Sequence, residues 1–283
     1  MADTMMHFKD NGLETHFLTD EEIMNVCPNA FKTEPTNPKV SEKYVQATTI
    51  DVVRDMRALG WYPVQAKQCR PKKGSSGIRS FHMVCLQNPN IKIMNGDNVE
   101  AYPRIMLTTS HDGFCSFKFM VGLFRLVCSN GLVIADEEYA NLSIRHINYT
   151  MEELKKTVAI AVDNLPNKIQ MLNNMRNTVL TDEQREDFVV NAIKVKKGLS
   201  PEQNFTISKE EILDILEPIR DEDKGNTLWA TFNVIQEKLI KGGYSLSNGK
   251  KSRRQRGITS IKKDIEINQN LYAIANSYVN LAA

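Results

Sequence analysis

Apolar residues recur every three or four positions in several segments of the chain, which predicts helices with one buried face. The first clear example is segment 49–59, whose apolar positions are Ile50, Val53, Met56 and Leu59. Thr48 or Thr49 can supply the N-cap oxygen, and Gly60 suits the position after the last turn. We therefore expect a helix over 49–59 that ends at the glycine.

A second pattern, the alternation of apolar and polar residues, follows this helix and predicts strands. It is clearest in 78–86, where Phe81, Met83 and Cys85 occupy every second position. Segments 102–109 and 115–127 predict a hairpin closed by Ser110-His111-Asp112-Gly113, because Asp-Gly is a strong turn signal. Further extended segments are expected at 61–66, 132–134 and 141–147.

The helical spacing returns after residue 150 and continues to the end of the chain. Thr181 and Gln184 form a capping box, Pro166 is expected to kink or split its helix, and a basic linker follows Gly243. The expected helices are 151–177, 181–197, 208–216, 226–241 and 267–281.

Because strands come first and helices follow, the predicted fold class is α+β, with an antiparallel sheet, an N-terminal helix and a helical C-terminal half. Three regions are expected. Residues 1–40 are predicted to form an irregular arm with one short helix capped by Thr19 and Glu22. Residues 41–149 would form a β-rich core with one helix, and 150–283 a helical region packed on that core.

Composition places the chain among globular proteins, since 41% of its 283 residues are hydrophobic and 25% are charged. The net charge is only +2, so any nucleic acid would have to bind a local basic patch. We expect neither a signal peptide nor a membrane span, because no apolar stretch approaches about 18 residues. The five cysteines are scattered and never form C-x-x-C, which indicates free thiols in a reducing cytoplasm.

The standard nucleotide-binding, hydrolase and zinc motifs are absent from the sequence, so we expect no cofactor and favour a protein that is not an enzyme. Two weaker groups of residues leave enzymatic alternatives open. His111 and Asp112 could ligate a metal, although a simple turn is favoured because no third ligand is evident. Cys128 with His146 could form a thiol nucleophile, but a packed cysteine is favoured. A nuclease using His111, Asp112 and His146 is the corresponding enzyme hypothesis.

Two clusters of basic residues suggest contacts with phosphate groups. The first lies in and beside the hairpin that precedes residue 81, and two aromatic residues accompany it: Lys67, Arg70, Lys72, Lys73 and Arg79, with Trp61 and Tyr62. The second lies in the expected basic linker and consists of Lys250, Lys251, Arg253, Arg254 and Arg256. Aromatic faces could stack unpaired bases. The simpler alternative for the second cluster is a solvated linker.

Five segments carry a resemblance to a known family. They are Gly60-Trp61-Tyr62-Pro63-Val64, Ser110-His111-Asp112-Gly113, 123–132, 226–237 and 268–272. In this order they resemble the phage/plasmid-like protein family that carries domain of unknown function nine-three-two, over about residues 40 to 280. The Arg125-x-x-Cys-Ser-Asn-Gly block is the most specific part. The resemblance implies a bacteriophage or mobile-element protein expressed inside a bacterium, and it transfers no catalytic residues.

The order of helix 49–59, Gly60-Trp61, antiparallel strands and a further helix also resembles the core of single-strand annealing recombinases. This resemblance implies rings or filaments that hold single-stranded DNA in a basic groove. The leading hypothesis is therefore a homo-oligomeric protein that binds single-stranded DNA in replication or recombination, with strand annealing as a further expected activity. The two basic clusters would contact phosphates, and Trp61 or Tyr62 would stack bases. The alternative is a phage structural or host-defence-inhibiting protein whose partner is another protein.

Overall fold

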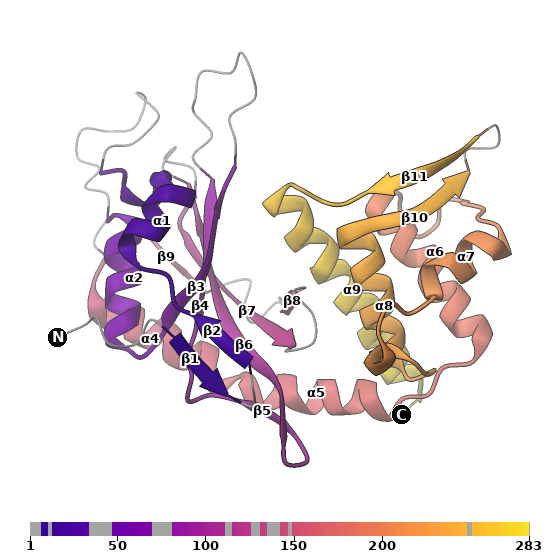
Figure 1. Ribbon diagram of the computed structural model, residues 1–283, viewed down its shortest axis with the longest axis horizontal. Helices are drawn as coiled ribbons and strands as arrows, with labels where there is room; N and C mark the ends of the chain where they lie inside the picture. The colour runs from indigo at the N-terminus through magenta and orange to yellow at the C-terminus, as the bar shows by residue number, and fades with distance from the viewer. Residues whose placement is uncertain are drawn as a thin grey trace. The chain divides into compact units, whose positions relative to one another are not determined.

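Figure 1 shows the computed structural model, which describes residues 7–10, 13–33, 47–69, 81–110, 115–125, 131–134, 142–146, 149–247 and 251–282. The chain divides into two compact units, unit 1 (Met1–Leu165) and unit 2 (Pro166–Ala283). Unit 1 contains the large antiparallel sheet, and unit 2 is mainly helical. The predicted α+β class, with strands first and a helical C-terminal half, is confirmed.

The sheet of unit 1 has seven strands in the main order β3-β4-β6-β7-β8, and all neighbouring strands are antiparallel. Two short strands complete it, because β5 pairs with β6 and β9 pairs with β7. The strands are β3 (Tyr62–Gln68), β4 (His82–Gln87), β5 (Ile93–Asn95), β6 (Asn98–Thr109), β7 (Phe117–Arg125), β8 (Gly131–Ile134) and β9 (Ser143–Ile144).

One face of this sheet packs against α2 (Thr49–Ala58) and α4 (Met151–Asp163), which forms the core of unit 1. The register places Val84 opposite Leu107, and Leu107 opposite Phe119, so these side chains form one buried row. The helix expected over 49–59 is confirmed as α2. The Thr48 hydroxyl caps it by accepting the N–H of Asp51 at 3.2 Å.

Within 7–10 and 13–33, the N-terminal segment is more regular than the irregular arm that the sequence predicts. Strands β1 (His7–Asp10) and β2 (Leu13–His16) pair with each other, and α1 (Asp20–Val26) and the 3₁₀-helix η1 (Pro28–Phe31) follow. The capping box of Thr19 and Glu22 is confirmed. Ile23, Cys27 and Ala30 are buried in the core of unit 1, which explains why this segment is ordered.

Unit 2 is built around α8, which is buried along almost its whole length. Figure 1 shows α6, α7 and α9 around it, with the hairpin β10–β11 at one end of the unit. Its elements are α5 (Leu165–Asn177), α6 (Asp182–Lys197), α7 (Lys209–Leu216), the 3₁₀-helix η2 (Asp221–Asp223), α8 (Leu228–Lys241), β10 (Gly242–Ser247), β11 (Ser252–Arg256) and α9 (Ile261–Ala282).

Four of the five helices predicted after residue 150 agree with the structure, whereas the start of the last helix and the segment before it differ. Pro166 splits the segment 151–177 into α4 and α5, as expected. The last helix begins at Ile261 rather than at residue 267, with the Ser260 hydroxyl accepting the N–H of Lys263 at 3.4 Å. The predicted basic linker is wrong, because the residues after Lys241 form the antiparallel hairpin β10–β11.

None of the helices within the described ranges is both long and apolar enough to cross a membrane.

Candidate nucleic-acid interface

The three arginines of the second basic cluster, Arg253, Arg254 and Arg256, lie on β11 of the hairpin β10–β11. The register pairs Leu246 with Arg253 and Ser245 with Arg254. Because side chains alternate along a strand, Arg254 and Arg256 share one face and Arg253 lies on the other. All three arginines are exposed, whereas Tyr244 and Leu246 of β10 are buried. The arginines of β11 (Arg253, Arg254 and Arg256), which we call the arginine strand, are thus exposed, whereas the apolar side chains of β10 are buried.

A glycine pair starts the hairpin directly at the end of α8. Gly242 has φ +77° and Gly243 has φ +95°, a region that residues with a Cβ rarely adopt. A Cβ on Gly242 would lie 2.6 Å from the backbone carbon of Arg256 and from the carbonyl oxygen of Gln255. Only glycine therefore allows β11 to come this close to the helix end, and this contact fixes the position of the arginine strand.

Lys196 of α6 holds the end of the same strand. Its Nζ donates to the carbonyl oxygens of Leu239 at 2.8 Å and of Arg256 at 3.3 Å. It also lies 4.9 Å from the centre of the Tyr244 ring. Burial disfavours the ammonium form and lowers the pKa of Lys196 to about 8. One side chain therefore joins α6, α8 and both strands of the hairpin.

Two carboxylates of α7 contact the hairpin on the side of β10. Asp214 accepts the backbone N–H of Ser245 at 3.1 Å, and Glu211 accepts the N–H of Ser247. Within the described ranges, no acidic side chain forms an ion pair with Arg253, Arg254 or Arg256. The acidic groups thus cover the β10 edge, and the positive charge of β11 remains exposed to solvent.

The described part of the first basic cluster is small and lies on unit 1. Lys67 is exposed at the end of β3, on the sheet face opposite to α2 and α4. The register extends this row across the sheet through Met83 and Thr108 to Lys118, which is exposed on β7. Lys118 was not predicted, and only the strand register could have identified it.

Arg104 lies on this same sheet face but is largely buried. Its Nε donates to Oε1 of Gln87 at 2.8 Å. Burial lowers the pKa of Arg104 to about 10, because the charged form loses hydration. This arginine therefore belongs to the packing of the sheet rather than to an exposed phosphate-binding row.

Trp61, one of the two predicted stacking residues, is only 2% exposed and belongs to the core of unit 1. Its position after Gly60 gave no signal of burial. Tyr62 is half-buried and its ring already stacks on Phe17, with centroids 5.0 Å apart. Neither ring is presented as an open platform for a base.

Several predicted residues lie outside the described ranges: Arg70, Lys72, Lys73, Arg79, Lys250, His111, Asp112 and Cys128. His146 is described and is buried, with Nε2 at 2.8 Å from the Thr109 hydroxyl and its ring 4.0 Å from that of Phe117. This environment is typical of a packed histidine. The residues that the structure describes contain no cluster of three His, Cys, Asp or Glu that could hold a metal ion.

Comparisons with known proteins agree with the family resemblance seen in the sequence. The UPF0380 protein YafZ of Escherichia coli (strain K12) is 30% identical over 261 residues, which are 92% of this chain and 91% of that protein. The UPF0380 protein YfjQ of the same strain is 28% identical over equal shares. No solved structure matches the chain. The family described as "Domain of unknown function (DUF932)" matches residues 38–270. This match covers most of the chain, so the protein belongs to the DUF932 family.

Proposed function

We propose that this protein binds single-stranded DNA without catalysing a reaction, and that the hairpin β10–β11 provides the main contact. The observation that carries the proposal is the exposed arginine strand, because Arg253, Arg254 and Arg256 have no acidic partner among the described residues. Exposed guanidinium groups of this kind pair with phosphate oxygens, often through two parallel hydrogen bonds.

The geometry of β11 supports contact with a phosphate backbone rather than with one small anion. Arg254 and Arg256 lie on the same face, about 6.6 Å apart along the strand, so they can reach different phosphates. Lys251 precedes them, is exposed and adds a further positive charge. Such a row recognises charge and spacing but not base identity, so weak sequence preference is expected.

The test is a salt series of fluorescence-anisotropy titrations with labelled single-stranded and double-stranded oligonucleotides. We expect tighter binding to single strands and an affinity that falls steeply with salt. Replacing Arg253, Arg254 and Arg256 by Gln removes up to three phosphate contacts, so the slope of log K against log salt should fall by about 2.

The matched control replaces three exposed lysines outside the hairpin, Lys155, Lys156 and Lys224, by Gln. It makes the same change in net charge and should leave most of the affinity intact. Equal losses in both variants would mean that only net charge matters, which contradicts a contact at β11. Absence of binding to either oligonucleotide at low salt would overturn the proposal, and a protein partner would become the next hypothesis.

Strand annealing and homo-oligomerisation are the finer parts of the same proposal. With the same proteins, annealing is measured by the pairing rate of complementary labelled strands, and the oligomeric state is measured by light scattering. If the arginine variant retains its oligomeric state and loses annealing, the hairpin acts through DNA contact.

A further inference from the structure

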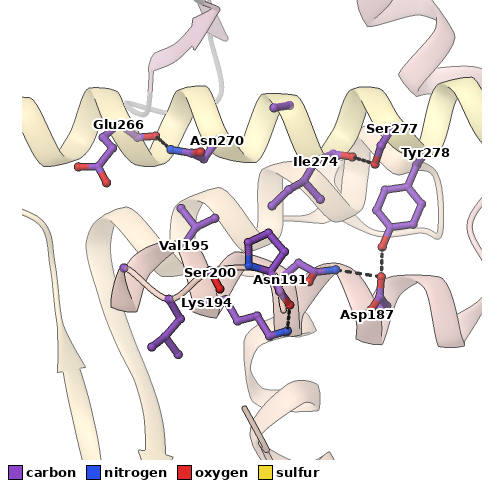
Figure 2. A pocket seen from close by; sticks show the side chains of 14 residues that line it. Asp187, Asn191, Lys194, Val195, Ser200, Glu266, Asn270, Ile274, Ser277 and Tyr278 are labelled. Carbon is purple, nitrogen blue, oxygen red and sulfur yellow. Dashed lines mark hydrogen bonds between the residues drawn. The ribbon is translucent and has the colours of Figure 1, made fainter. Parts of the chain in front are cut away.

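A groove lies between α6 and α9 in unit 2. It has a volume of about 760 Å³, within the usual range for sites that bind small molecules. Figure 2 shows the two helices facing each other, with the turn 198–201 beside α6. Asp187 and Tyr278 meet at one end of the groove, and Glu266 lies toward the other end of its α9 side. The groove does not involve the hairpin β10–β11.

The apolar part of the groove is mainly aliphatic. Its lining includes Val195, Leu199, Ala273 and Ile274. The aromatic residue Tyr278 offers little open surface, because it is only 7% exposed and its ring packs against Phe188, with centroids 5.6 Å apart. The groove therefore suits an aliphatic ligand better than a flat aromatic ring.

The hydrogen-bond donors at the Asp187 end are used within the protein. The Tyr278 hydroxyl donates to Oδ2 of Asp187 at 2.7 Å, and Nδ2 of Asn191 donates to the same oxygen at 3.0 Å. Burial and the hydrogen bond to Asp187 raise the pKa of Tyr278, so its hydroxyl stays protonated. The two bonds hold the carboxylate in place and leave its second oxygen, and the amide oxygen of Asn191, as acceptors.

Three further donors along the groove also form hydrogen bonds within the protein. Nδ2 of Asn270 donates to the carbonyl oxygen of Glu266 at 2.7 Å, and the Ser277 hydroxyl donates to that of Ile274 at 2.7 Å. The Nζ of Lys194 donates to the carbonyl oxygen of Pro201 at 2.6 Å. The groove thus presents mainly acceptor oxygens, and a matching ligand must supply the donors.

Two carboxylates mark the ends of this surface. Asp187 contacts Tyr278, and Glu266 lies twelve residues earlier on α9. A helix rises 1.5 Å per residue, so this spacing corresponds to about 18 Å along the groove. Glu266 pairs with Lys263 at 2.9 Å, which is an exposed contact of small energy that a ligand amine can replace.

We propose that this groove binds a linear aliphatic polyamine. Its terminal ammonium groups would contact Asp187 and Glu266, and its methylene chain would lie along Ala273 and Ile274. Ammonium groups carry three donors and no acceptor, which matches the acceptor-rich walls. This inference is independent of the proposed DNA binding, because its site shares no residue with β11.

The experiment is calorimetric titration of the full-length, nucleic-acid-free protein with spermine, compared with putrescine and butylamine. Spermine is long enough to reach both carboxylates, so it should bind at least tenfold more tightly than the other two amines. Asp187→Asn keeps the shape and an acceptor oxygen, and should weaken spermine about tenfold, the usual effect of one charged hydrogen bond. Glu266→Gln should weaken it less, because the Glu266 carboxylate is already paired with Lys263.

Two further variants make the result decisive. Ala273→Leu places a larger side chain in the groove at an exposed helix position, and leucine is a good helix former, so the change should abolish binding without loss of folding. Glu152→Gln makes the same charge change on α4 of unit 1, and it should leave the affinity unchanged. Equal affinity for spermine and butylamine, or no effect of Asp187→Asn and Ala273→Leu, would overturn the proposal.

Discussion

Lys196 shows how a single residue can determine the position of a functional element. Its ammonium group contacts carbonyl oxygens at the end of α8 and at the end of β11, above the ring of Tyr244. The cost of burying this charge appears as a pKa near 8, below the usual value of 10.5. The hydrogen bonds of Lys196 fix the hairpin. Its positive charge, however, is less stable at this buried position than it would be in water.

This lowered pKa predicts how stability changes with pH. Between about pH 8 and 10.5 the unfolded chain keeps the proton of Lys196 while the folded protein has lost it. The unfolded state binds more protons in this window, so the contribution of Lys196 to stability rises with pH. After allowance for the partial solvent exposure of the group, we expect a gain of about 1 kcal/mol relative to Lys196→Met.

The measurement is denaturant unfolding of both proteins at several pH values from 7 to 10.5. Tyr272, whose pKa is raised by burial, is present in both proteins, so its effect cancels in the difference. A difference between the two proteins that does not change with pH would contradict this interpretation of Lys196.

At the scale of elements, the sequence predicts those whose pattern is long and regular. Helix α2 was found from its apolar spacing and its N-cap, and α6 from its capping box. The hairpin β10–β11 was missed because it is short and follows a helix directly, and its basic residues indicated a linker. The alternation of buried Tyr244 and Leu246 with Ser245 and Ser247 was a signal that could have found it.

The candidate site was predicted in part, for a similar reason. The arginines of β11 were identified by their charge, because a cluster of basic residues can be seen in the sequence without knowledge of the tertiary contacts. The contacts that position them involve Lys196, Gly242 and α7, which are 14 to 60 residues away in the sequence, and no local pattern reveals them. Trp61 was misjudged because its burial depends on how α2 packs against the sheet.

The junction of α8 and β10 gives a prediction for this element. Gly242→Ala combines an unfavourable φ with a clash against the backbone of β11, and should destabilise the protein by about 2 kcal/mol or more. Gly198→Ala is the matched control, since Gly198 also has positive φ (+71°) but a methyl group at its Cβ position would have no neighbouring atom within 4 Å. It should cost about 1 kcal/mol, because alanine is strained in the left-handed backbone conformation.

Thermal and denaturant unfolding measure the stability of both variants, and titration with DNA reports whether the hairpin still binds. Gly242→Ala should also weaken DNA binding, because the arginine strand is displaced, whereas Gly198→Ala should not. Equal destabilisation by the two substitutions would show that the close approach of β11 to the helix end has no energetic weight.

At the scale of the whole molecule, the chain contains two units that each bury their own apolar residues. Phe188 of α6 and Phe232 of α8 form the centre of unit 2, with ring centroids 6.3 Å apart. Neither side chain belongs to the core cluster of unit 1. A unit of this size with its own core can be expected to fold alone.

We therefore predict that a fragment comprising residues 164–283 folds independently. It should show a helical circular dichroism spectrum and a single cooperative thermal transition. It should also retain the DNA affinity that depends on β11 and the spermine affinity of the groove. A fragment that is unfolded, while the full-length protein is folded, would show that unit 2 depends on unit 1.

The arginine strand has a second consequence, which concerns solubility. In the part of the chain that the structure describes, β11 pairs with a strand on one side only, so its other edge could accept a strand from another molecule. Positive charges along such an edge repel a second identical edge and prevent open-ended aggregation. Replacing the arginines by neutral residues removes this protection, so a variant made to abolish DNA binding should be purified at low concentration and examined for fibrils.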